Sequence, residues 1–121
     1  MRFLNLQGID IRPDRSAEFQ RWVIANDERI RKAYPAGTEY GGCYANIFSS
    51  EKQMGSAVWI EVLDSYGALD TLAAAGKDPS HPLAQVQAEL IEFFDPRPTA
   101  GWSKILLKDV LDATVADLPV E

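Results

Sequence analysis

The sequence predicts a single α+β domain in which an antiparallel sheet carries helices on one face. Two observations lead to this prediction. Segments with the apolar–polar alternation of strands lie at both ends and in the middle of the chain, and amphipathic helical patterns separate them. The element order is therefore β-α-β-β-α-β, the split pattern of ferredoxin-like folds. The 121 residues fit one core, so we assign the domain to residues 1–113 and treat the acidic residues 114–121 as a C-terminal tail.

The N-terminal third predicts a strand followed by a helix. Residues 2–12 alternate and are rich in strand formers, which favours the first strand. Phe19, Trp22 and Ile30 recur at helical spacing between charged side chains, so we expect an amphipathic helix over residues 14–33. The segment Tyr34-Pro35-Ala36-Gly37 ends it, because proline cannot continue the helical hydrogen bonds and glycine permits a chain reversal.

The middle of the chain predicts an antiparallel hairpin. Its strands are expected over residues 38–49 and 53–63, with a short polar turn between them. The pair Gly41-Gly42 inside the first of these strands predicts a β-bulge or a sharp bend. Such a bulge shifts the register of this strand, and with it the assignment of its side chains to the two faces of the sheet.

The last third predicts a helix in two pieces and a final strand. The first piece begins at Asp64 or Ser65, and a Gly- and Pro-containing segment interrupts it before His81. An apolar stripe then continues to Phe94. Residues 101–110 complete the sheet.

Composition excludes several classes of function. The chain has 18 acidic and 12 basic residues and a net charge of −6, which argues against binding to nucleic acids and to anionic membranes. One cysteine, Cys43, and one histidine, His81, provide neither an internal disulfide nor the usual ligands of a zinc site. The sequence contains neither an apolar run of roughly 20 residues nor a signal-peptide pattern. We therefore expect a cytoplasmic protein without a metal or a cofactor.

Alternation divides the sheet into two faces with different chemistry. One set of strand residues is small or apolar, and we expect it to pack beneath the helices. Its members are Leu4, Leu6, Cys43, Ala45, Ile47, Val58, Ile60, Val62, Ile105 and Leu107. The other set mixes large aromatic rings with amides and two charged groups. Its members are Phe3, Asn5, Gln7, Tyr44, Asn46, Phe48, Ala57, Trp59, Glu61, Trp102, Lys104 and Leu106. We expect a second copy of the chain to cover this aromatic face, leaving a ligand pocket inside a homodimer.

With this order of elements, their lengths and an aromatic third strand that ends at Asp64-Ser65, the chain resembles the dimeric α/β-barrel superfamily. This group includes antibiotic-biosynthesis monooxygenase-like, heme-degrading, EthD-like and NIPSNAP-like families. The resemblance implies a homodimer with a pocket for a small aromatic or hydrophobic molecule. The heme-degrading branch places an Asn on the first strand and a His on the second helix, which Asn5 and His81 match. The Trp of that pattern corresponds to Thr71 here, so we expect no heme cofactor.

Resemblance to the cofactor-independent monooxygenases implies an enzyme that oxidises an aromatic or polyketide-like compound with O₂. Glu61 would be the base, and the amides of Asn5 and Asn46 would stabilise the oxyanion that forms. The remaining candidates would contact the ligand, and they are Gln7, Tyr44, Trp59, Trp102, Lys104 and His81.

Each of these roles has a structural alternative. The aromatic side chains suit a dimer interface equally well, Glu61 and Lys104 could form an ion pair, and His81 suits an exposed position at the start of a helix. A non-catalytic protein that binds a ligand or a partner therefore remains the second hypothesis.

Overall fold

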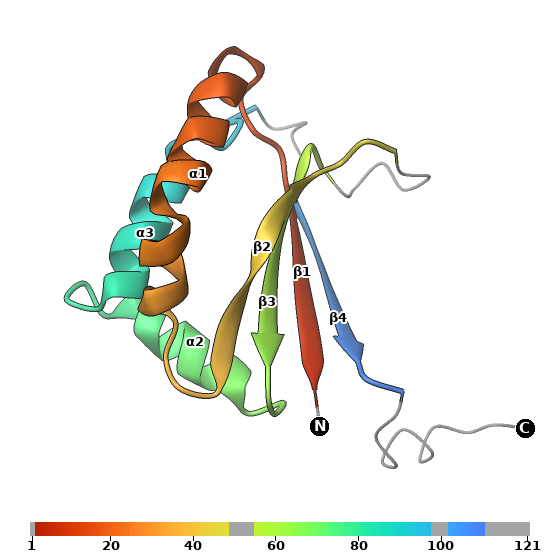
Figure 1. Ribbon diagram of the computed structural model, residues 1–121, viewed down its shortest axis with the longest axis vertical. Coiled ribbons are helices and arrows are strands. Elements are labelled where there is room, and N and C mark those ends of the chain that lie inside the picture. Colours follow the sequence, from red (N-terminus) through yellow and green to blue (C-terminus); the bar gives the residue numbers. More distant parts are fainter. Residues whose placement is uncertain (1, 49–54, 98–101, 111–121) are drawn as a thin grey trace, which may run out of the picture.

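A computed structural model describes residues 2–48, 55–97 and 102–110 of the chain (Figure 1). The described elements follow the predicted ferredoxin-like order, with the second helical region divided into two helices. They are β1 (Phe3–Ile9), a 3₁₀ turn (Pro13–Arg15), α1 (Ser16–Ala33), β2 (Thr38–Ala45), β3 (Ala57–Leu63), α2 (Ala68–Lys77), α3 (Pro82–Ile91) and β4 (Trp102–Lys108). The α+β fold class is thus confirmed, while the predicted tail, residues 114–121, lies outside the described residues.

The four strands form one antiparallel sheet in the order β2-β3-β1-β4. Figure 1 shows α1, α2 and α3 together on one side of this sheet. In the two pairings of β1, Asn5 lies opposite Glu61 of β3 and Gln7 lies opposite Lys104 of β4. Polar side chains from three strands therefore meet in the central part of the sheet.

The predicted bulge is present in β2. The pairing of β2 with β3 shifts register between Tyr40 and Gly42. Gly42 has a φ of +104°, and a Cβ atom at Gly41 would lie only 2.7 Å from Cγ2 of Ile60. Glycine is required at both positions, one for its backbone angle and the other for the close approach of β3.

The helices cover the opposite face of the sheet from the one predicted. Trp59 and Asn5 are only 2% and 1% exposed, and the Trp59 ring stacks against Trp22 of α1 at a centroid distance of 6.4 Å. Phe19 and Trp22 of α1 pack against Phe93, which follows α3, so the helix layer is itself rich in aromatic rings. The expectation that the small apolar set lies beneath the helices is wrong for its members on β1, β3 and β4, because these bulky helical side chains pack on the large rings of the sheet; Cys43 and Ala45 of β2 do lie beneath α1.

The members of the small apolar set on β1, β3 and β4 accordingly form the uncovered face of the sheet, which we call the open face. Its described members on β1, β3 and β4 are half-buried or exposed, and they are Leu4, Leu6, Val58, Ile60, Val62, Ile105 and Leu107. Tyr44 joins this face because the bulge pairs it with Val58, and it is 60% exposed. Cys43 pairs with Trp59 and lies under the helices. The prediction that Tyr44 shares a face with Trp59 is therefore wrong, and the register shift is the reason.

Candidate functional site

A chain of hydrogen bonds connects four buried or half-buried side chains between the sheet and the helices. Trp59 Nε1 donates to the Tyr34 hydroxyl at 2.8 Å, and this hydroxyl donates to Oε2 of Glu61 at 2.5 Å. From the other side, Nδ2 of Asn5 donates to Oε1 of Glu61 at 2.8 Å. Each oxygen of the Glu61 carboxylate thus accepts one hydrogen bond from the protein.

Local structure explains how these groups meet. Tyr34 is the first residue beyond α1 and has an extended backbone (φ −75°, ψ 131°), as expected of a residue before proline. The helix therefore ends where this side chain can reach the sheet. Glu61 lies in the middle of β3, directly opposite Asn5 in β1, so the sheet pairing itself brings the carboxylate to the amide.

Chemistry fixes the direction of each hydrogen bond. Burial, followed by the nearby Glu61 charge, raises the pKa of Tyr34 far above its ordinary value. The hydroxyl group therefore stays protonated and acts as the hydrogen-bond donor to Glu61. A carboxylate only accepts hydrogen bonds, so Asn5 must present its amide nitrogen to Glu61. A carboxylate oxygen has more than one lone pair, and each oxygen of Glu61 can therefore still take a proton from a bound molecule.

A cleft of about 290 Å³ opens over this carboxylate. We call it the polar cleft. The sheet provides its polar floor, while α2 and α3 provide an apolar wall and two further polar groups. The lining residues are Asn5, Gln7, Glu61, Leu69, Leu72, Ala73, Gly76, Lys77, Gln87 and Lys104.

Two details concern the wall and the floor of the polar cleft. A Cβ atom at Gly76 would lie 2.7 Å from Oε1 of Gln87, so glycine lets α2 and α3 approach at the wall. Within the described part of the chain, Oδ1 of Asn5 is buried and has no hydrogen-bond partner. A buried acceptor without a donor is costly, which makes this atom a candidate for contact with a ligand hydroxyl or amine.

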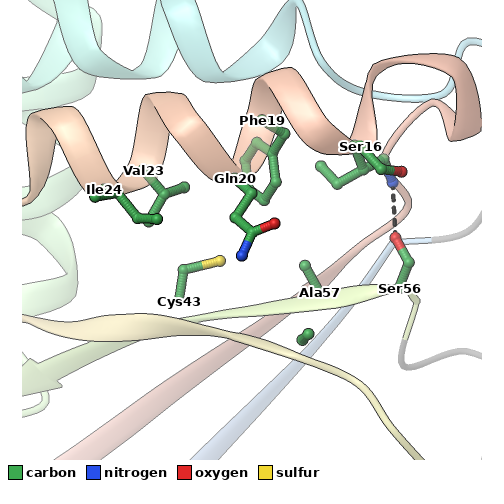
Figure 2. Close-up of a pocket in the computed structure, with 10 residues that line it drawn as sticks. Ser16, Phe19, Gln20, Val23, Ile24, Cys43, Ser56 and Ala57 are labelled. Carbon is green, nitrogen blue, oxygen red and sulfur yellow. Dashed lines mark hydrogen bonds between the residues drawn. The ribbon is translucent and has the colours of Figure 1, made fainter.

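A second cavity, of about 490 Å³, lies between α1 and the β2–β3 hairpin (Figure 2). We call it the apolar cavity. Figure 2 shows Phe19, Val23 and Ile24 above it on α1, with Cys43 and Ala57 below it on the sheet. Burial raises the pKa of the Cys43 thiol to about 11, which keeps it neutral and a poor nucleophile. The backbone N–H of Ile11 donates to Oγ of Ser56 at 3.0 Å, and both residues line the cavity.

Four of the predicted site residues lie together in the polar cleft, and they are Asn5, Gln7, Glu61 and Lys104. Trp59 does not line the cleft, but its Nε1 donates a hydrogen bond to the hydroxyl group of Tyr34. The side chain of Trp102 lies outside the described residues.

Three predicted site residues line neither the polar cleft nor the apolar cavity. The Asn46 amide donates to the carbonyl oxygen of Gly55 at 3.0 Å and joins the ends of the hairpin. His81 forms the N-cap of α3, where its Nδ1 accepts from the Leu83 N–H at 3.0 Å. Tyr44 lies on the open face, as its pairing with Val58 requires.

Sequence reasoning missed Tyr34, Lys77 and Gln87. Tyr34 was interpreted only as part of a helix stop, although an aromatic residue before proline at a helix end can turn toward the core. Lys77 and Gln87 come from two helices whose mutual packing no local pattern reveals. In the described residues, no group of three or more His, Cys, Asp or Glu side chains is placed to hold a metal ion, and no helix is long and apolar enough to cross a membrane.

Comparison with known proteins relates the chain to solved structures by fold. No family model matches the sequence, and no curated protein sequence matches it. An uncharacterised NIPSNAP domain protein from Burkholderia xenovorans superposes with a TM-score of 0.61 and 13% identity, covering 89% of this chain and 94% of that one. A dimeric ferredoxin-like protein of unknown function from Jannaschia gives 0.57 and 12%, covering 90% and 100%. The heme-degrader MhuD of Mycobacterium tuberculosis, solved with two hemes bound in its active site, gives 0.51 and 14%, covering 92% and 98%. These similarities place the chain among ferredoxin-like folds.

Proposed function

We propose that this chain is a small-molecule enzyme in which Glu61 of the polar cleft removes a proton from an aromatic or polyketide-like substrate. The observation that supports the proposal is a carboxylate that is only 4% exposed, is held by Tyr34 and Asn5, and still lines an open cleft. A general base must be held in place within reach of its substrate, and this arrangement meets that requirement.

The chemistry is monooxygenase-like and needs no cofactor. Glu61 takes a proton from an acidic C–H or O–H group, and the amide of Gln7 or Gln87 can donate to the resulting oxyanion. The electron-rich carbanion then gives its electrons to O₂. One oxygen atom becomes a carbonyl oxygen of the product, and the other leaves as water with the two hydrogens of the substrate carbon. Anthrone and O₂ giving anthraquinone and water is a balanced reaction of this type.

We also propose that the chain forms a homodimer through the open face. Leu107 is 44% exposed and Tyr44 60% exposed on a sheet face that no described helix covers. The Jannaschia neighbour is described as a dimeric ferredoxin-like protein. A second copy of the chain placed on this face would bury its apolar side chains around a two-fold axis.

Glu61→Gln tests the proposed base. Anthrone in D₂O serves as the probe, with deuterium incorporation at its CH₂ group and O₂ uptake as separate readouts. We expect both rates to fall about 100-fold or more in the variant, the usual contribution of a general base. Glutamine can still accept from Tyr34 and, once the Asn5 amide is flipped, pair with it, so the melting temperature should change little. The matched control is Glu28→Gln on the exposed surface of α1, away from the cleft and the open face. Unchanged rates in Glu61→Gln, or no exchange with the unmodified protein, would rule out the proposed role.

The apolar cavity favours one alternative, a non-catalytic protein that binds a hydrophobic molecule. It is larger than the polar cleft, and Glu61 does not line it. Saturable binding of an apolar ligand that Val23→Trp blocks, with no turnover, would support that alternative. The heme-degrading activity of the mycobacterial neighbour is less well supported, because Nδ1 of His81 is already used as a helix cap.

A further inference from the structure

We propose that the polar cleft recognises a small aromatic acid by its two ends, with an anionic group on Lys77 and Lys104 and a hydroxyl group on Asn5 and Glu61. The inference rests on the proposed function for its site but not on the reaction. It concerns the class of ligand that the charges and the unpaired groups of the cleft select.

Charge is the first argument. The chain carries a net charge of −6, yet the residues that line the polar cleft include two lysines and only one carboxylate residue, Glu61. Lys77 comes from the last turn of α2 and Lys104 from β4, so two separate elements bring positive charge to the same opening. Among the described residues neither lysine forms an ion pair, whereas six other cation–carboxylate pairs are formed elsewhere in that part of the chain. Unpaired lysines converging on a cleft favour an anionic ligand.

The floor of the cleft supplies the second argument. Oδ1 of Asn5 is buried without a partner, and Glu61 keeps free lone pairs after accepting from Tyr34 and Asn5. Both groups are acceptors, so the floor suits a hydrogen-bond donor. The single O–H of a ligand hydroxyl group could donate to either of these acceptors, while a second carboxylate there would be repelled by Glu61.

Geometry connects the two ends. Asn5 and Gln7 lie on the same face of β1 two residues apart, and Lys104 is the β4 partner of Gln7. Two residues along a strand span roughly 6.8 Å, which is about the length of one aromatic ring with a substituent at each end. The volume of about 290 Å³ lies near the lower end of the range for ligand pockets, and Leu69 and Leu72 supply an apolar wall for such a ring.

Three probe molecules distinguish the contributions of the two ends of the cleft to binding. They are 4-hydroxybenzoate, its uncharged amide 4-hydroxybenzamide, and benzoate, which lacks the hydroxyl group. We expect 4-hydroxybenzoate to bind at least about fivefold more tightly than either of the others when dissociation constants are measured by calorimetry at low salt. The Lys77→Gln/Lys104→Gln variant should lose this preference for the acid over the amide and leave the affinity for the amide unchanged.

The control variant is Lys32→Gln, which removes one charge from the exposed surface of α1. It should leave all three affinities as they are. Equal binding of the acid and the amide, binding of none of the probes, or an unchanged preference in the double variant would each overturn the proposal.

The outcome is separable from that of the Glu61 experiment. Lysine-dependent binding of 4-hydroxybenzoate together with unchanged turnover in Glu61→Gln would retain the acid-binding cleft and remove the proposed base. Loss of turnover in Glu61→Gln with no preference for the acid would retain the base and remove this inference.

Discussion

The hydroxyl group of Tyr34 donates to Oε2 of Glu61 at 2.5 Å and joins the end of α1 to the middle of β3. The same hydroxyl accepts from Trp59, so it fixes a carboxylate of the polar cleft and an indole of the core at once. The candidate base is therefore held by the helix layer as well as by its neighbour in the sheet.

Tyr34→Phe should destabilise the protein. The change leaves the Trp59 N–H and one oxygen of Glu61 without their partner, and a buried group in that state costs about 1–3 kcal/mol. Chemical denaturation followed by tryptophan fluorescence would measure the loss. Tyr66→Phe is the matched control, since that ring is exposed, and it should leave the free energy of unfolding unchanged. Equal stability of the two variants would show that the Tyr34 hydrogen bonds contribute nothing net.

Ile60→Asp should convert the proposed homodimer into a monomer. Ile60 lies in the centre of the open face, and a carboxylate placed there would be desolvated in an interface between two copies. Light scattering coupled to size-exclusion chromatography would report the mass. Ile91→Asp, at the exposed end of α3, introduces the same charge on the helical side and should leave the mass unchanged. A dimer that survives Ile60→Asp would place the interface elsewhere.

Cys43 should react slowly with alkylating reagents at neutral pH. Burial raises its pKa from 9.0 to about 11, so the thiolate fraction at pH 7.5 falls about 100-fold relative to the unfolded chain. A time course of iodoacetamide labelling, followed by mass spectrometry, should therefore run at least about 100-fold faster in denaturant. The native rate should rise with pH toward 11. Similar rates for folded and unfolded protein would contradict a buried, neutral thiol.

Acid should weaken the packing of α1 on α3. Arg29 and then Trp22, by hydrogen bonding, lower the pKa of Glu89 from its ordinary 4.5 to about 2. The unfolded chain thus binds this proton first, so the contribution of Glu89 to stability is complete above about pH 5 and is lost as the pH falls toward 2. Melting temperatures measured between these limits should fall less steeply in Glu89→Gln. The control is Glu28→Gln, which removes an exposed carboxylate of α1 and should show the same fall of melting temperature with pH as the unmodified protein. The same pH dependence of the melting temperature in all three proteins would show that Glu89 does not contribute to acid sensitivity.

Local patterns were sufficient for most of the fold. Helical spacing from Phe19 to Ile30 and strand alternation around Trp59 are properties of neighbouring residues, so the elements and their order could be predicted. The Gly41-Gly42 pair also revealed its bulge, because only glycine accepts the backbone angle and the close approach found there. Alternation likewise grouped Asn5, Gln7, Glu61 and Lys104 on one face, and these four residues do line one cleft.

Tertiary structure decided which face the helices cover and what the cleft contains. Alternation assigns side chains to two faces but is symmetric between them, and the choice depends on how Trp22 and Phe93 pack against Trp59. The bulge moved Tyr44 onto the open face, since one extra residue reverses the sides of the strand beyond it. Tyr34, at the end of α1, contacts Glu61, and Lys77, in the last turn of α2, lines the cleft beside it. The sequence by itself therefore determined the elements and the residues that share a face, because these follow from short-range periodicity, whereas packing between distant segments decided the site.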